Sequence, residues 1–147
     1  MDRMTPKQRH YCMSRILGKA TKPELLVRRW LWSHGYRYRL NVDSVPGKPD
    51  IVLRKYRTAI FVNGCFWHGH TGCPQYVVPK TNTEFWKNKI TRNKERDNQN
   101  YKSLHDAGWN VIVVWECQLK KNQIEKTMLG LEHFLSQAIL SVYHQEL

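Results

Sequence analysis

The feature that most constrains this chain is the stretch from Ile60 to Cys73, where an apolar segment runs into a cluster of metal-ligating residues. Residues 59–62 are apolar and partly β-branched, which predicts a buried strand. The next eleven residues, 63–73, hold two Cys, two His, three Gly and two adjacent large aromatic side chains. Because glycines favour backbone turns, the sequence predicts an ordered loop that follows a core strand and presents aromatic side chains to a partner.

Three residues of this loop have side chains that bind zinc. Cys65, His70 and Cys73 lie close together and supply the local half of a tetrahedral site. Cys117 follows a second apolar segment, and it completes a Cys₃His site if that strand lies beside residues 59–62. The alternative is that these cysteines are separate buried thiols, but their close spacing among glycines favours zinc.

The charge balance indicates the kind of partner. Lys and Arg number 24 against 12 Asp and Glu, a formal net charge of +12 over 147 residues. Such an excess favours a polyanion, above all nucleic acid, although a merely soluble basic protein is the alternative. No apolar run is long enough to cross a bilayer, and the first residues lack the apolar core of a signal peptide. We therefore expect a cytoplasmic protein without membrane association, whose cysteines are thiols or metal ligands rather than disulfides.

Capping boxes and apolar spacing predict the secondary structure. Residues 5–8 and 21–24 each place Thr at the start of a helix, with Gln or Glu three positions later. Helices are expected over 6–16, 21–35, 83–108 and 124–143, and strands over 36–41, 51–53, 59–62 and 109–115.

This order of elements predicts an α/β or α+β sandwich, with a mixed sheet, a hairpin of its first two core strands and helices on both faces. We expect one domain over 1–147. Its parts are a basic arm or helix at 1–20, a core at 21–120 and a final helix at 121–147.

The long helix carries two polar residues on its inward face. At three- and four-residue steps this face contains Trp86, Ile90, Asn93, Asp97, Tyr101 and Leu104. A buried polar group without a partner costs roughly 1–3 kcal/mol. Asn93 and Asp97 are therefore expected to pair with each other or to serve an active site.

Asp50 stands between a turn and the apolar strand 51–53, at a sheet end where a hydrated magnesium ion could reach it. The alternative is an ordinary turn aspartate after Pro49. The pair matches the first half of the Pro-Asp…Asp/Glu-x-Lys signature of restriction-type nucleases. Residues 61–63, Phe-Val-Asn, lack the acid and lysine of the second half, so a metal here must use backbone carbonyls, water and phosphate.

Several other residues have both a chemical and an ordinary interpretation. His68 could deprotonate an attacking water, or replace His70 as zinc ligand, or face solvent. Glu24 is explained by its capping box alone. Aromatic side chains that could stack on bases or wedge between them, and that could equally pack in a core, are Phe66, Trp67 and Trp86.

Five motifs, in this order along the chain, resemble the very short patch repair endonucleases. They are Gly-Lys-Pro-Asp at 47–50, Gly-Cys-Phe-Trp-His-Gly-His at 64–70, Thr-Glu-Phe-Trp at 83–86, Asn-Lys-Glu-Arg-Asp at 93–97 and Val-Val-Trp-Glu-Cys at 113–117. The resemblance implies a restriction-endonuclease-like fold, a three-layer sandwich with a structural zinc. It also implies magnesium-dependent nicking of one strand 5′ of the thymine in a T·G mismatch left by deamination of 5-methylcytosine.

The resemblance also implies roles for individual residues. Asp50 would hold magnesium, helped by the backbone carbonyl near Val62, and His68 would be the water-activating base, oriented by Glu24. Asp97 would belong to the same site. Zinc would be bound by Cys65, His70, Cys73 and Cys117. DNA would be contacted by the wedge of Phe66, Trp67 and Trp86, by Lys89 and Asn93, and by the helix around Met13. The expected enzyme is a monomer acting on double-stranded DNA, with other mismatch-repair proteins as further partners.

Two departures from the family pattern concern the site. Asn63 stands where better-known members carry a histidine, so one phosphate-contacting imidazole is absent, and the spacing from His70 to Cys73 is one residue looser. The alternatives are a zinc-stabilised DNA-binding module with a decayed active site, and a restriction-associated nuclease of the same fold with another substrate.

Overall fold

The computed structural model describes residues 21–146, and side chains as far as Val142. Its helices are α2 (Lys22–Ser33), α3 (Thr83–Asp106) and α4 (Ile124–Glu146), and its strands are β1 (Ile51–Leu53), β2 (Thr58–Asn63) and β3 (Asn110–Trp115). Two short 3₁₀ helices, η1 (Arg54–Tyr56) and η2 (Glu116–Leu119), follow β1 and β3. The predicted helix over 6–16, with Met13, lies outside the described residues.

The three strands form a mixed sheet in the order β1-β2-β3. β1 and β2 are antiparallel with Ile51 opposite Ile60, so the predicted hairpin is confirmed. η1 closes this hairpin, and Arg57 after it adopts a left-handed backbone with φ of 48°. β2 and β3 are parallel with Ile60 opposite Ile112, and α3 is the crossover that a parallel pair requires.

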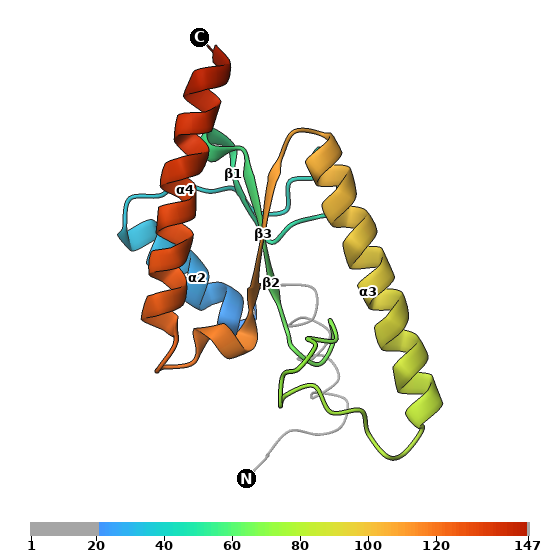
Figure 1. Ribbon diagram of the computed structural model, residues 1–147. Helices are drawn as coiled ribbons and strands as arrows, with labels where there is room; N and C mark the ends of the chain where they lie inside the picture. The colour runs from blue at the N-terminus through green and yellow to red at the C-terminus, as the bar shows by residue number, and fades with distance from the viewer. Residues whose placement is uncertain (1–20, 147) are drawn as a thin grey trace, which may run out of the picture.

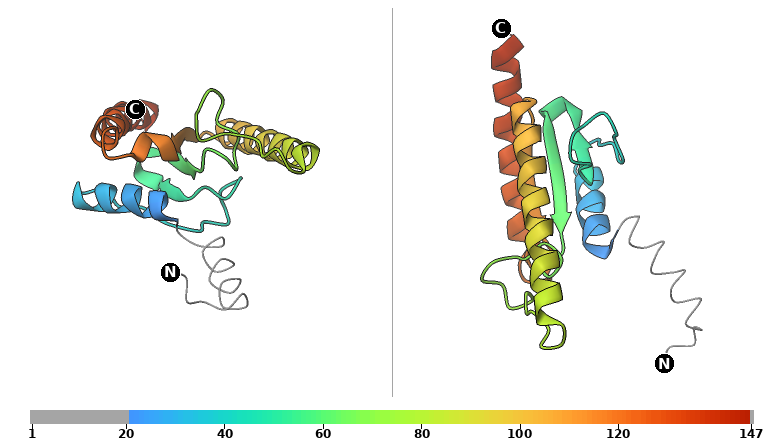
Figure 2. Two further views of the ribbon diagram at one scale, coloured as in Figure 1. Left: turned by 90° about the horizontal axis from the view of Figure 1, so that it is seen from below. Right: turned by 90° about the vertical axis from the view of Figure 1, so that its right-hand side faces the viewer.

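Helices cover both faces of the sheet: α2 and α4 lie on one side and α3 on the other (Figures 1 and 2). Alternate strand residues face the two layers, as the strand period of two demands. The α2–α4 side is a core that includes Val27, Leu31, Ile51, Leu53, Ile60, Val114, Met128, Leu131 and Leu135. The α3 side is a smaller core of Val45, Val52, Ala59, Phe61 and Leu104. The α/β class, the mixed sheet and the helices on both faces are thus as predicted.

The prediction of a strand over 36–41 is wrong. Arg39 alone forms a β-bridge, exchanging two 2.9 Å backbone hydrogen bonds with Val52 at the free edge of β1. Asn41 has a left-handed backbone with φ of 53°, which ends the extended conformation and turns the chain away from the sheet. The alternating pattern arises because Tyr36, Tyr38 and Leu40 pack against the α2–α4 core while the intervening arginines face solvent.

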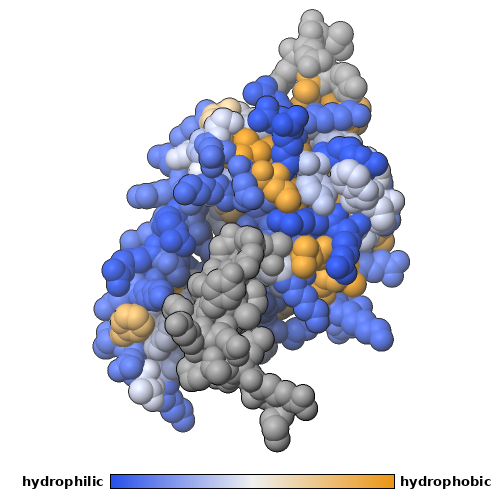
Figure 3. All heavy atoms as spheres, turned by 180° about the vertical axis from the view of Figure 1, so that it is seen from behind, coloured by the Kyte–Doolittle hydropathy of each residue, from blue (hydrophilic) through white to orange (hydrophobic). Residues whose placement is uncertain are grey.

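The surface seen from behind is largely hydrophilic, with small separate hydrophobic patches (Figure 3). Among the helices of residues 21–146, none has the length and apolar character that crossing a bilayer would take.

Candidate active site

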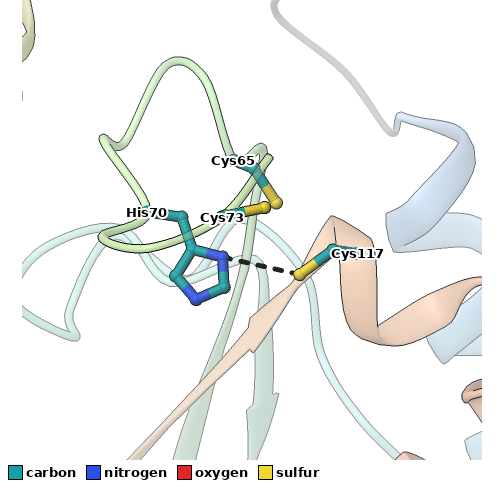
Figure 4. A group of neighbouring side chains, drawn as sticks. All are labelled: Cys65, His70, Cys73 and Cys117. Carbon is teal, nitrogen blue, oxygen red and sulfur yellow. Dashed lines mark hydrogen bonds between the residues drawn. The ribbon is translucent and has the colours of Figure 1, made fainter. Parts of the chain in front are cut away.

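The four predicted zinc ligands converge at one edge of the sheet. Because β2 and β3 are parallel and Asn63 lies opposite Trp115, both strands end at the same edge. Cys65 and the loop to Cys73 follow β2, while Cys117 lies in η2 just after β3, so the ligands meet from two directions (Figure 4). Their donor atoms all lie within 4.8 Å of one another.

This cluster fits a tetrahedral ion. With zinc–sulfur bonds of about 2.3 Å and zinc–nitrogen bonds of about 2.0 Å, neighbouring donors should lie roughly 3.5–3.8 Å apart. Cys117 Sγ lies 3.5 Å from His70 Nδ1, and the His70 ring is stacked on Trp115 at a centroid distance of 4.1 Å, which fixes its plane. Three thiols and one imidazole form the donor set of structural zinc sites, so the residues present can hold a metal ion.

Burial would make this cluster unfavourable for thiolates without a metal. Desolvation raises the pKa of the Cys65 thiol to about 12 and also raises the pKa of Cys117, whereas the backbone N–H of Gln75 lowers the pKa of Cys73. A bound metal stabilises the thiolate form and offsets this desolvation.

The loop between the ligands is packed tightly against α3. Gly69 has φ of 61°, and a Cβ atom there would lie 2.7 Å from Ile90 Cγ2. Glycine is therefore required at this position, both for the backbone conformation and for the close approach of the loop to the helix.

Asp50 and Val62 form a second candidate metal site. Asp50 Oδ2 accepts a hydrogen bond of 2.7 Å from the backbone N–H of Val62. In an antiparallel strand the N–H and C=O of one residue point to the same neighbour, so the Val62 carbonyl is directed to the side on which Asp50 lies. A carboxylate and a backbone carbonyl on one side are ligands suited to a hard divalent cation.

The surroundings of Asp50 bring further predicted residues to the same place. Burial raises the pKa of Asp50 to about 6, although the Val62 N–H opposes this shift. Neighbouring charges act as well: Glu24 raises the pKa of Asp50, while His68 and Arg28 lower it. Residues from α2, β2 and the loop after β2 therefore all act on this one carboxylate.

The hydrogen bonds of His68 and Glu24 differ from the expected ones. His68 Nδ1 lies 2.6 Å from Asp97 Oδ2, so α3 orients this imidazole. Glu24, on α2, instead accepts a 2.7 Å hydrogen bond from Arg28 Nη2 one turn along the helix. The expectation that Glu24 orients His68 is thus replaced by two separate pairs. The predicted place of Asp97 in the site has a structural reason, its contact with His68.

Asn63 is buried at the end of β2, with 3% of its surface exposed. Its side-chain amide donates a 2.9 Å hydrogen bond to the Tyr101 hydroxyl, one helical turn beyond Asp97 on α3. His68, Asp97 and Tyr101 also line one pocket together with Lys94. Two residues that the sequence assigned to the site are therefore hydrogen-bonded to α3: His68 through Asp97, and Asn63 through Tyr101.

Sequence reasoning did not assign a role to Arg28 or Tyr101. Both had a usable signal, because Arg28 follows Glu24 by four residues and Tyr101 follows Asp97 by four residues on predicted helices. Such i, i+4 pairs share a helix face. Their spacing alone does not reveal which distant residue either of them contacts.

The predicted wedge residues form an aromatic cluster, which we define as Phe66, Trp67, Phe85 and Trp86. Their ring centroids lie 5.2–5.8 Å apart in neighbouring pairs. Trp67 is 44% exposed and Phe85 54% exposed, so the cluster is not a core. The sequence did not predict Phe85 as part of this cluster, because Trp86 and not Phe85 lies on the inward face of the predicted helix.

Polar residues of α3 border the aromatic cluster. Lys89 Nζ lies 5.4 Å from the centroid of the Trp67 ring, in reach of a cation–π interaction. Asn93 donates a 2.9 Å hydrogen bond to the Trp67 carbonyl, which fixes the loop against α3. Of the residues expected to contact DNA, all that are described, namely Phe66, Trp67, Trp86, Lys89 and Asn93, therefore lie together.

A strongly basic chain that combines a carboxylate, a carboxylate-paired histidine and exposed aromatic side chains has the attributes of a DNA endonuclease. Comparison with known proteins gives the family: the profile described as DNA mismatch endonuclease Vsr matches residues 1–75. This chain belongs to that family of DNA endonucleases, which are hydrolases of DNA mismatch repair.

Individual relatives are similar over most of the chain. The DNA mismatch endonuclease Vsr of Escherichia coli K12 is 43% identical over 108 residues, covering 74% of this chain and 69% of that protein. The Type II nicking enzyme V.NmeAIP of Neisseria meningitidis serogroup A is 51% identical over 129 residues, covering 88% and 91%. The Type II nicking enzyme V.XorIIP of Xanthomonas oryzae pv. oryzae is 46% identical over 118 residues, covering 80% and 86%.

Proposed function

We propose that this protein nicks one strand of duplex DNA 5′ of the thymine in T·G mismatches that arise by deamination of 5-methylcytosine. The observation that carries the proposal is the meeting of Asp50, the Val62 backbone and the His68–Asp97 pair beside an exposed aromatic cluster. Hydrolytic groups next to a surface that can stack on opened bases suit an enzyme that cuts beside a weakened base pair.

Asp50 and the Val62 carbonyl would hold magnesium, which when bound would polarise the scissile phosphate and lower the pKa of a water molecule. His68 would remove the proton from that water. Because Nδ1 faces the Asp97 carboxylate at 2.6 Å, Nε2 is the ring nitrogen left to accept the proton. Asp97 would then stabilise the imidazolium, as a carboxylate does beside a histidine base.

The Cys/His cluster would hold a structural zinc. Three of its ligands come from the loop after β2 and the fourth from η2, so a zinc ion would tie this loop to the end of β3. His68 and Trp67 lie on the same loop, between two of the ligands. The zinc would therefore fix both the base and part of the aromatic cluster.

The aromatic cluster would give selectivity for the mismatch. Opening a base step costs less beside a mispair than beside a matched pair, and an aromatic or apolar side chain can fill the opened step. The exposed ring of Trp67 would occupy the step beside the T·G pair, with Lys89 placed to contact the backbone phosphates.

The architecture and setting belong to the same proposal. A mixed sheet with helices on both faces and an aspartate beside its hairpin supports a restriction-endonuclease-like fold. We further propose a single domain over 1–147 that acts as a monomer, with a DNA-contacting arm at 1–20. Its location would be the cytoplasm beside the nucleoid, where it would meet other mismatch-repair proteins.

The test is a nicking assay with magnesium on three duplexes of one sequence, which carry T·G, T·A or C·G at one position, with the two strands labelled separately. We expect a nick only in the T·G duplex, only in the thymine strand and 5′ of that thymine. Equal cutting of all three duplexes, or cutting of the guanine strand, would contradict the proposal.

A second candidate has support from the comparisons. V.NmeAIP and V.XorIIP are described as Type II nicking enzymes, which favours a nuclease that accompanies a restriction system and acts in a different sequence context. The assay distinguishes the two when the T·G pair is placed in several flanking sequences. A DNA-binding module without catalysis is disfavoured, because the chain belongs to a family of endonucleases.

A further inference from the structure

Arg28 lies on the inner part of α2, one turn after Glu24. Its Nη2 donates a 2.7 Å hydrogen bond to Glu24 Oε1, and only 18% of its side chain and 9% of that of Glu24 are exposed. Neither residue is on an open helix surface, where an i, i+4 pair contributes only a few tenths of a kcal/mol. A half-buried arginine at this position requires a reason beyond helix stability.

The guanidinium of Arg28 is incompletely satisfied. Its Nε atom is buried and finds no hydrogen-bond acceptor among residues 21–142. A buried donor without a partner is unfavourable by about 1–3 kcal/mol, and native proteins keep few such groups. Arginine binds carboxylate and phosphate groups through several N–H donors of its planar fork. Glu24 engages only Nη2, and 18% of the Arg28 side chain remains exposed, so an anion at the surface can approach the guanidinium.

The charges around Arg28 indicate which anion this is. Three carboxylates, from Glu24, Asp50 and Asp97, serve the candidate site, and Asp97 is already paired with His68. Both members of the Arg28–Glu24 ion pair act on the pKa of Asp50, which Arg28 lowers and Glu24 raises, so the pair lies within electrostatic reach of that carboxylate. A DNA phosphate that approaches this group of acids is repelled unless cations stand nearby. Asn63, which is neutral and bound to Tyr101, cannot supply a positive charge.

We propose that Arg28 binds a phosphate oxygen of the strand being nicked and stabilises the negative charge that develops there during hydrolysis. Glu24 positions this arginine by holding its Nη2. The assignment rests on the proposed function, since the phosphate that Arg28 binds is that of the nicked strand. Arg28 would thus supply a fixed positive charge in an active site where Asn63 stands in place of the family's histidine.

Single-turnover nicking of the T·G duplex with magnesium tests the assignment. Arg28→Ala should slow nicking by about 100-fold or more, the usual effect of removing one donor to a developing oxyanion. The matched control is Arg29→Ala, which removes the same charge from the next, exposed position of α2 and should change the rate less than about threefold. Binding of the uncut duplex without divalent metal should change less than the rate does in Arg28→Ala.

Chemical rescue separates a phosphate contact from a structural role. Added guanidinium ion should restore part of the nicking rate of Arg28→Ala and none in Arg29→Ala. Arg28→Lys should retain more activity than the isosteric neutral Arg28→Gln, because lysine keeps the charge without the fork. The absence of rescue in folded Arg28→Ala, or loss of folding by the Ala, Gln and Lys variants alike, would overturn the assignment in favour of a structural role.

Glu24→Gln completes the experiment. If Arg28 acted only by holding Glu24, then Arg28→Ala would cause no additional loss in a Glu24→Gln background. We expect a further loss of at least about tenfold there, a barrier of 1.4 kcal/mol. If the parent nicks T·G and Arg28→Ala nicks it equally fast, the Arg28 assignment fails and the proposed function stands. If the parent nicks none of the duplexes, both fail together.

Discussion

Asp50 Oδ2 accepts a 2.7 Å hydrogen bond from the backbone N–H of Val62, across the β1–β2 hairpin. This single hydrogen bond does not offset the burial of the carboxylate, because the pKa of Asp50 is still raised to about 6. A half-buried acid that is unfavourable in its ionised form is typical of a group kept for function. The relationship leads to two separate predictions, one for activity and one for stability.

The first prediction concerns activity. Asp50→Asn should abolish magnesium-dependent nicking of the T·G duplex while leaving its binding nearly unchanged, because affinity for DNA comes mostly from lysine and arginine contacts to phosphates. The measurement pairs a nicking assay with a binding titration at fixed salt. Asp43→Asn, an exposed aspartate in the loop before β1, is the control and should nick normally. Full activity of Asp50→Asn would remove Asp50 from the mechanism.

The second prediction concerns stability without divalent metal. Because the folded pKa of Asp50 lies near 6 and the unfolded value near 3.8, its proton stabilises the fold fully below about pH 4. This contribution is lost as the pH rises through 6. Asp50→Asn keeps a neutral side chain at all pH values and should be more stable than the parent at pH 8, by on the order of 1–3 kcal/mol.

Urea denaturation of both proteins at pH 5 and pH 8, in the presence of a chelator for magnesium, checks this expectation. The advantage of the Asn variant over the parent should be smaller at pH 5 than at pH 8. A variant that is less stable than the parent at pH 8 would mean that the carboxylate is needed for folding rather than for hydrolysis.

Much of the site follows from sequence because a few strong patterns fix where strands end. Once residues 59–62 and 109–115 are recognised as neighbouring core strands, Cys117 must arrive beside Cys65, and all four donors meet. Asp97 was noticed for the same kind of reason, a polar residue on an apolar helix stripe. These inferences depend on periodicity and chain direction, which the sequence carries directly.

The hydrogen-bond partners of individual side chains could not be predicted from the sequence. They depend on differences of a few tenths of an ångström in the distances between elements that are remote in sequence. The family resemblance gave Glu24 as the residue that orients His68, whereas the placement of α3 against the loop brings Asp97 to this imidazole instead. The prediction of a strand over 36–41 was wrong for a related reason. Alternating apolar and charged residues indicate that one side of the segment is buried, but they do not show whether a neighbouring strand lies close enough to pair with it.

The third prediction concerns the hydrogen bond between Asn63 and Tyr101. Tyr101→Phe removes the acceptor of a side-chain amide that is almost fully buried, and it should reduce the free energy of unfolding by about 1–3 kcal/mol. It should also slow nicking, because Asn63 loses the group that orients it. Tyr38→Phe, at a half-buried position packed on the α2–α4 core, is the control.

Asn63→His should change the nicking rate by less than about tenfold, and a gain of several hundredfold would mark the parent site as impaired.

The fourth prediction concerns the metal cluster. The purified protein should contain one zinc per chain, retained when magnesium is removed with a weak chelator. Cys117→Ser should lower the melting temperature by about 10 °C or more, because it opens a site that ties the loop after β2 to the end of β3. Metal analysis and thermal denaturation check both statements. A protein without zinc, or a Cys117→Ser variant as stable as the parent, would contradict the assignment.

The last prediction separates mismatch recognition from general DNA binding within the aromatic cluster. Trp67 and Phe85 are both exposed aromatic residues of this cluster, at 44% and 54%, but Trp67 is on the loop with His68 and Phe85 is on the first turn of α3. Stacking on a base contributes about 1–3 kcal/mol, and only where the base step can open. Trp67→Ala should therefore reduce the preference for T·G over T·A duplexes by about 5- to 150-fold.

Phe85→Ala should weaken binding of both duplexes to a similar and smaller extent, because its ring packs against Trp86 in a T-shaped arrangement and it lies on α3 rather than on the loop that carries His68. Binding titrations of each variant against both duplexes at one salt concentration give the ratio directly. If Trp67→Ala lowers the two affinities equally, its ring contributes to general binding or to packing. If Phe85→Ala is the variant that loses the ratio, the wedge is the N-terminal turn of α3 rather than the zinc loop.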